Sequence, residues 1–113
     1  MNLLSDGAAP DPVDPDNPMP PSKLSPSTRD AWLSAHPEWS LADGKLHRVF
    51  LFRDFVEAFA WMGRIAVVAE AMLHHPEWLN VYRTVEVWLT THDAAGVTTL
   101  DLELAEAMEQ SLP

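Results

Sequence analysis

The spacing of apolar positions predicts a β-hairpin in the first half of the chain. Residues 39–52 read WSLADGKLHRVFLF, with Asp43-Gly44 at the centre. This residue pair favours a two-residue type I′ turn between antiparallel strands. After the turn, one face of the expected strand carries Leu46, Phe50 and Phe52 and the other carries His47, Val49 and Leu51.

A second hairpin is expected from WLNVY at residues 78–82 and VEVWLTT at residues 85–91. Val85, Val87 and Leu89 alternate there with polar or amphipathic side chains, as in a half-buried strand. DAAGVTTLD, over residues 93–101, follows as a loop.

A long helix is expected between the hairpins, over residues 54–74. One apolar stripe at helical spacing consists of Phe55, Phe59, Met62, Ala66 and Leu73, and a second consists of Val56, Ala60, Gly63 and Val67. A helix that is apolar on two sides is covered on two sides. We therefore expect one side to pack on the sheet and the other to meet a second subunit, which would suit so small a domain.

Helices are also predicted before the first hairpin and at the C-terminus. The first has Ser25 or Ser27 as its cap candidate, with Pro26 near the first turn, and is stopped by Pro37. The last covers about residues 100–111. Thr98 and Asp101 approximate a capping box for the last helix. The order α-β-β-α-β-β-α predicts the α+β class, with a four-stranded antiparallel sheet and three helices on one face.

Composition separates the first 26 residues from the rest. Seven of the ten prolines and four aspartates fall within residues 1–26. Such a segment buries too little apolar surface to offset its chain entropy. We therefore expect a disordered or extended arm over residues 1–26 and one folded domain over residues 27–113.

Charge and residue usage exclude several classes of function. The formal net charge is −10, from seventeen acidic against seven basic residues, which argues against direct nucleic-acid binding. The absence of cysteine excludes disulfides and thiolate metal sites. Neither a secretory signal nor a membrane-spanning segment is evident, so we expect a cytoplasmic protein without membrane partners.

Two adjacent histidines and a third, eighteen residues after the first, are the candidate catalytic groups. Pro76 disfavours helical geometry at His75, so we expect the long helix to end near His74. Glu70 precedes His74 by one helical turn and is expected to orient that ring. His92 closes the last strand, and strand ends and helix ends commonly form the rim of a cleft.

The three histidines allow more than one interpretation. Imidazoles sharing a cleft suit general acid–base catalysis, because they donate and accept protons near neutral pH. A plain structural role at the helix end is an alternative. A three-histidine zinc site has the right number of ligands, although adjacent histidines rarely point to one metal. A nucleophilic mechanism has little support, since cysteine is absent and no serine lies in a nucleophile-elbow context.

The same residues resemble a known family. The pattern comprises Glu70, His74-His75-Pro76-Glu77-Trp78, Asn80-Val81-Tyr82, Thr91-His92 and Asp101. It closely resembles the signature of the pterin-4a-carbinolamine dehydratases, over roughly residues 25–112. The resemblance implies a four-stranded antiparallel sheet with three helices on one side. It also implies a homodimer or homotetramer, with the long helix contributing to the tetramer.

The resemblance further implies dehydration of a 4a-hydroxytetrahydropterin to the quinonoid dihydropterin. This reaction recycles the pterin of aromatic amino-acid hydroxylases, which are possible pathway partners, and no metal or organic cofactor is expected. Some relatives instead serve as dimerisation cofactors of a transcription factor, or as assembly chaperones. The outer face of the 54–74 helix would suffice for that alternative.

By resemblance, His74, His75 and His92 carry the chemistry, with His75 and His92 as the proton-transfer pair and His74 in contact with the pterin. The positions that match the lining of the pterin pocket are Pro76, Thr91 and Asp93.

Three further residues have supporting roles in this interpretation. Trp78 is either a wall of the pocket or a core residue, while Glu70 and Asp101 support the site. The sequence departs from the family pattern at Leu79, where an aromatic is common, and at the segment 36–39, which reads HPEW in place of LPGW. Neither departure removes a histidine of the motif.

Overall fold

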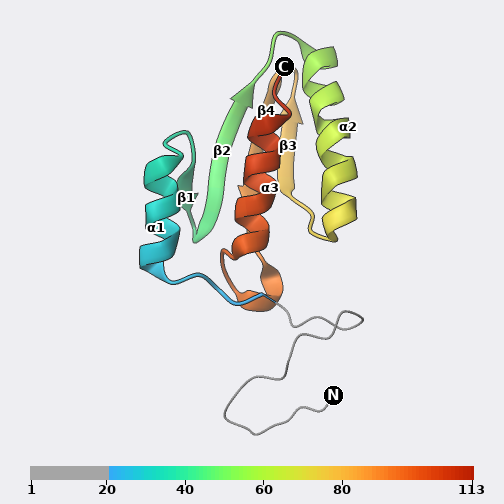
Figure 1. Ribbon diagram of the computed structural model, residues 1–113. Coiled ribbons are helices and arrows are strands. Elements are labelled where there is room, and N and C mark those ends of the chain that lie inside the picture. Colours follow the sequence, from blue (N-terminus) through green and yellow to red (C-terminus); the bar gives the residue numbers. More distant parts are fainter. Residues whose placement is uncertain (1–20) are drawn as a thin grey trace, which may run out of the picture.

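The computed structural model describes residues 21–113, which form three α-helices, four β-strands and one short 3₁₀ helix (Figure 1). The elements are α1 (Pro26–Ala35), β1 (Ser40–Ala42), β2 (Lys45–Leu51), α2 (Phe55–Met72), β3 (Glu77–Val81), β4 (Thr84–Leu89), η1 (His92–Ala94) and α3 (Thr99–Gln110). This order confirms the predicted α-β-β-α-β-β-α arrangement. No helix within residues 21–113 combines the length and apolar character needed to span a bilayer.

The four strands form one antiparallel sheet in the order β1-β2-β4-β3. The three helices lie on one face of this sheet, as Figure 1 shows, so the predicted α+β fold is confirmed. β2 and β4 are the central strands, paired from Leu46 opposite Leu89 to Leu51 opposite Thr84. The C-terminal end of α2, the start of β3 and the end of β4 therefore lie at one end of the sheet.

The first hairpin turns where the sequence predicts. Ala42 pairs with Lys45, which leaves Asp43 and Gly44 as the two loop residues. Both have positive φ angles, 52° and 76°, as a type I′ turn requires. The Asp-Gly pair was an informative signal because few residue types accept this backbone conformation.

The core lies between the sheet and the helices. Leu46 and Phe50 of β2 and all three alternating apolar residues of β4 are buried. Trp61 of α2 is fully buried among them, and its indole Nε1 donates to the carbonyl oxygen of Met108 in α3 over 3.1 Å. Burial of each large apolar side chain contributes about 1.5–3 kcal/mol. This packing fixes α2 and α3 against the strands that position the candidate site.

The buried face of α2 differs from both predicted stripes. The buried residues are Ala58, Trp61, Ile65 and Ala69. Most of the predicted stripe residues are exposed instead, namely Phe55, Val56, Phe59, Ala60, Gly63, Ala66, Val67 and Leu73. The prediction was wrong because α2 is apolar around most of its circumference. Helical spacing alone then cannot rank one face above another.

α2 ends two residues earlier than predicted. Leu73 adopts the left-handed conformation at φ 53°, and the backbone N–H of His74 donates to the carbonyl of Ala69 over 3.0 Å. Together with the bond from Leu73 N–H to the Glu70 carbonyl, this is a Schellman ending. Pro76 is therefore not the residue that stops the helix.

Most of the predicted N-terminal arm lies outside the described residues. Its last part, residues 21–26, is described. It runs beside the loop that precedes α3, and Pro26 is already the first residue of α1. The backbone N–H of Leu24 donates to the carbonyl of Val97 over 2.8 Å. Ser25 then caps α1, accepting from the backbone N–H of Thr28.

Candidate active site

His74 enters the interior directly after the left-handed turn that ends α2. Its side chain is 10% exposed, and Nε2 donates to Oδ1 of Asp101 over 2.6 Å. Asp101 belongs to the first turn of α3 and is fully buried. The pair therefore connects the end of one helix to the beginning of another.

Asp101 satisfies several donors at once. Its second oxygen, Oδ2, accepts from the backbone N–H of Thr98 over 2.9 Å and from the Thr91 hydroxyl over 2.8 Å. Thr98 in turn caps α3, so the predicted capping box is present. The Asp101 carboxylate therefore helps to cap the N-terminus of α3 and also fixes the position of His74. The capping box was visible in the sequence, but the bond to a residue 27 positions away was not.

Glu70 contacts His75 and does not hold His74 as predicted. Oε1 of Glu70 lies 2.9 Å from Nε2 of His75, and both side chains are exposed. The predicted pair assumed that the helix continued to residue 74. The left-handed Leu73 breaks that spacing, because it turns His74 inward and leaves His75 on the outer side.

His92 reaches the site from the loop after β4. Thr91 pairs with Gly96 in an isolated bridge, and His92 begins the short η1 helix inside this loop. The His92 side chain is 78% exposed, and its Nε2 lies 3.2 Å from Oε2 of Glu77. Each of the three histidines thus has its own carboxylate partner.

Glu77 is a site residue that the sequence analysis did not single out. It is the first residue of β3, and Oε1 accepts from Nζ of Lys45 over 2.8 Å while Oε2 faces His92. The hydrogen bond from Lys45 is the main cause that holds the pKa of Glu77 below its usual range. Burial opposes this shift, and electrostatic contributions from Lys45 and His92 add to it. Glu77 stands within the quoted motif, but its link to Lys45 follows only from strand pairing.

One cavity of about 450 Å³ brings the three histidines together. Its lining comprises Leu73, His74, His75, Pro76, Glu77, Thr90, Thr91, His92 and Asp93. Six of the nine predicted site residues are thus in one place: the three histidines, Pro76, Thr91 and Asp93. They come from the end of α2, the start of β3 and the loop after β4.

The other three predicted site residues do not line the cavity. Trp78 is half-buried on the inner face of β3, with its ring centroid 6.2 Å from that of Trp61. Its packing supports the core alternative for this residue. Glu70 and Asp101 lie behind His75 and His74 and contact them through hydrogen bonds.

The donor groups of the cavity do not resemble a metal site. Within residues 21–113, no group of three or more histidine, aspartate or glutamate side chains is arranged to hold a metal ion. Each imidazole is instead directed at a separate carboxylate. Such pairing fixes ring orientation and suits groups that transfer protons to and from a bound molecule.

Known proteins of similar sequence point to one family. Residues 22–111 match the model of a family described as pterin 4 alpha carbinolamine dehydratase. A provisionally named pterin-4-alpha-carbinolamine dehydratase of Rhodopseudomonas palustris (strain BisB18) is 54% identical over 88 residues, which cover 76% of this chain and 87% of that protein. One from Bradyrhizobium sp. (strain BTAi1) is 57% identical over 89 residues, covering 77% of this chain and 90% of the relative.

A solved structure shows the same fold. The crystal structure of a protein named transcriptional coactivator/pterin dehydratase from Brucella melitensis superposes with a TM-score of 0.78. It is 39% identical in sequence, and the match covers 81% of this chain and all of that one.

Proposed function

Because this chain belongs to the pterin 4 alpha carbinolamine dehydratase family of hydro-lyases, we propose that its histidine cavity dehydrates a 4a-hydroxytetrahydropterin by general acid–base catalysis. The observation that carries the proposal is the single cavity of about 450 Å³ lined by His74, His75 and His92. Imidazole is the side chain best suited to exchange protons near neutral pH. The volume is in the range of small-molecule sites.

The reaction needs one acid and one base. The hydroxyl on C4a takes up a proton and leaves as water when the C–O bond breaks, and the N5 proton is removed as the C4a–N5 double bond forms. The product is the quinonoid dihydropterin. One proton is taken up and one is released, so a pair of histidines completes the cycle without a net change of charge.

We assign the proton transfers to His75 and His92, with His74 contacting the pterin. His75 and His92 are exposed and approach the cavity from different elements, so a ring between them could meet both imidazoles. His74 is buried and held by Asp101, which suits a fixed contact better than repeated proton exchange. Pro76, Thr91 and Asp93 would place backbone and polar groups around the ring.

The proposed pathway role is recycling of the pterin used by an aromatic amino-acid hydroxylase. The quinonoid product must then be reduced before it can serve again. The cytoplasmic location stays a prediction from the sequence.

We also propose that the chain assembles into a homodimer or homotetramer through α2. The outer surface of this helix exposes Phe55, Val56, Phe59 and Val67. Val67 is 71% exposed, so Val67→Glu should disrupt such a contact without unfolding the domain. Light scattering should then report a lower mass for the variant than for wild type, and equal masses would contradict the proposal.

A second candidate function uses the same surface without the histidines. The Brucella melitensis protein is named both a coactivator and a dehydratase, and an exposed apolar helix face suits a protein partner. In that case the chain would bind a partner through α2 whether or not the cavity is active. The stopped-flow experiment therefore tests the dehydratase function alone.

The decisive experiment is stopped-flow decay of a 4a-hydroxytetrahydropterin generated in place. Wild type should accelerate the decay, and His92→Ala should lose about a hundredfold or more of this acceleration, the usual contribution of a general acid or base. Arg83→Gln is the matched control, since Arg83 lies in the β3–β4 turn at the other end of the sheet. If folded wild type did no better than buffer, the dehydratase proposal would fall and the binding role would gain.

A further inference from the structure

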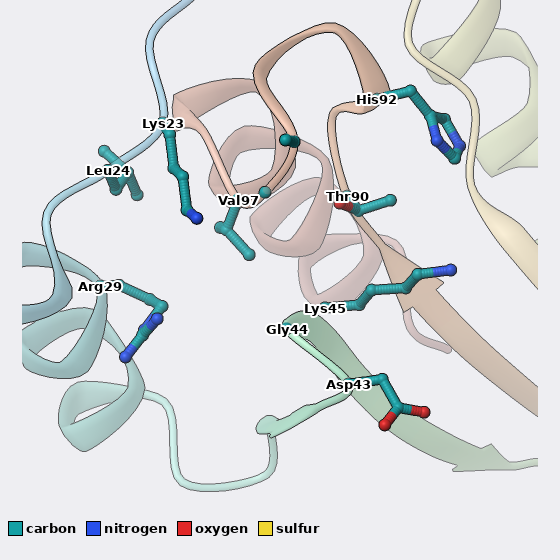
Figure 2. A pocket seen from close by; sticks show the side chains of 11 residues that line it. Lys23, Leu24, Arg29, Asp43, Gly44, Lys45, Thr90, His92 and Val97 are labelled. Atoms are coloured by element: carbon teal, nitrogen blue, oxygen red, sulfur yellow. The ribbon is translucent and has the colours of Figure 1, made fainter.

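A second cavity adjoins the histidine cavity and is lined by several basic side chains. It has a volume of about 260 Å³, and its lining includes Lys23, Arg29 and Lys45 (Figure 2). These are three of the seven basic residues in a chain whose net charge is −10. Such a concentration on an acidic protein points to an anionic ligand.

Backbone contacts fix the position of Lys23. The hydrogen bond from Leu24 N–H to the Val97 carbonyl holds the segment before α1 beside the loop before α3. The Lys23 side chain then runs over Gly96, where an added Cβ would lie only 2.7 Å from Cε of the lysine. A glycine at position 96 therefore leaves the space that the lysine stem occupies.

Arg29 and Lys45 complete the basic lining from two other elements. Figure 2 shows Lys23 and Arg29 on the side formed by the N-terminal segment and α1, with Lys45 and His92 across the pocket. Arg29 pairs only with its exposed neighbour Asp30 among the described residues, over 3.0 Å. Lys45 directs its ammonium to Glu77, and Asp43 is the single acidic residue of the lining.

The two cavities share part of their lining. Thr90 and His92 line both of them, and Glu77 links Lys45 of the basic cavity to His92 of the catalytic one. A molecule seated against the three histidines would need a side chain that passes His92 to reach the lining of the basic cavity. The pterin ring carries no anionic group near neutral pH, so the ring itself does not need these cations.

We propose that the basic cavity binds an anionic group, a phosphate or a carboxylate, at the end of the substrate's side chain. The substrate class would then be 4a-hydroxytetrahydropterins with an anionic side chain. This inference rests on the proposed dehydratase function and specifies which pterins it favours. A phosphate or carboxylate matches lysine and arginine donors, and their charge would attract it into an otherwise acidic surface.

The test compares two substrates on the full-length chain. One is the 4a-hydroxy derivative of 6-methyltetrahydropterin, which is neutral, and the other carries a phosphorylated or carboxylated side chain at position 6. Wild type should prefer the anionic substrate in kcat/KM. Lys23→Met, which keeps most of the stem, and Arg29→Gln should each lower kcat/KM for the anionic substrate about tenfold through KM, and leave the neutral substrate unchanged.

Two further variants sharpen the test. Gly96→Ala keeps every charge but displaces the Lys23 side chain, so it should reproduce the loss caused by Lys23→Met. Arg83→Gln removes one positive charge from the β3–β4 turn, at the other end of the sheet, and should leave kcat/KM unchanged for both substrates. A loss of the same size in Arg83→Gln would indicate a general charge effect and would overturn the proposal.

The outcomes separate this inference from the dehydratase proposal. If wild type accelerated both substrates equally, and Lys23→Met and Arg29→Gln had no selective effect, the anionic site would be wrong while the dehydratase would stand. If the dehydratase proposal were wrong, wild type would not accelerate the decay of even the neutral substrate. Inorganic phosphate should inhibit the reaction of the anionic substrate competitively and leave that of the neutral substrate unchanged. Inhibition of the neutral substrate would indicate that the cavity binds a free anion, and this would overturn the proposal.

Discussion

His74 and His75 are adjacent in the sequence but lie in opposite surroundings. His74 is buried and bonded to Asp101, which has no exposed surface and accepts two further hydrogen bonds. His75 is exposed and bonded to Glu70, which is also exposed. His92 with Glu77 resembles the second case. One imidazole is therefore part of the packed interior, whereas two remain accessible at the cavity.

The largest effect should come from breaking the buried pair. Asp101→Ala leaves His74, Thr91 and the N-terminus of α3 without their shared acceptor. We expect a loss of about 2–4 kcal/mol in the free energy of unfolding, measured by chemical denaturation. Glu103→Ala, an exposed position on the same helix, is the control. Equal denaturation midpoints for the two variants would show that the buried network contributes nothing.

Replacing the exposed His75 should lower activity without changing stability. His75→Gln keeps a polar side chain of similar size at an exposed position. We expect a loss of about a hundredfold in kcat with the free energy of unfolding within about 0.5 kcal/mol of wild type. Stopped-flow kinetics and denaturation on the same preparation measure both quantities. Loss of stability without loss of activity would instead favour the structural role considered for the histidine pair.

The smallest effect should come from Glu77. Its pKa is held below its ordinary value of 4.5, first by the Lys45 hydrogen bond. A depressed pKa in the folded state contributes stability above pH 4.5, and this contribution is lost as the pH falls through the folded-state value. Because the side chain is 39% exposed, the difference from Glu77→Gln should be only a few tenths of a kcal/mol at pH 7.

Denaturation of wild type and Glu77→Gln at pH 7 and at pH 3 measures this difference. It should shrink at the lower pH, while Glu103→Gln should differ little from wild type at either pH. A difference that grew as the pH fell would contradict the assigned direction of the shift.

Local signals explain why much of the fold could be predicted from the sequence. The Asp43-Gly44 turn, the Thr98–Asp101 capping box and the alternation in β4 each depend on neighbours within a few residues. These features depend on local backbone conformation and on which side chains are apolar, so they can be predicted from the residue types.

The failures have two physical causes. On α2, apolar residues occur on most sides, so the sequence pattern does not identify the face that packs inward. Trp61 and Ile65 are among the residues that the structure buries. At the site, a leucine in the left-handed conformation ended the helix, and residues other than glycine seldom adopt it. Because Leu73 ends the helix, Glu70 contacts His75 and not the predicted His74. The partners Asp101 and Lys45 depended on contacts between distant segments, which no local pattern reports.

The double use of Asp101 also has a consequence for the order of folding events. The carboxylate that begins α3 is the one that holds His74 at the end of α2, so helix initiation and assembly of this part of the cavity are a single cooperative event. An intermediate with α3 frayed at its first turn would lack an ordered His74. Heat inactivation should therefore coincide with the unfolding of α3, and no long-lived species should retain that helix while losing the site.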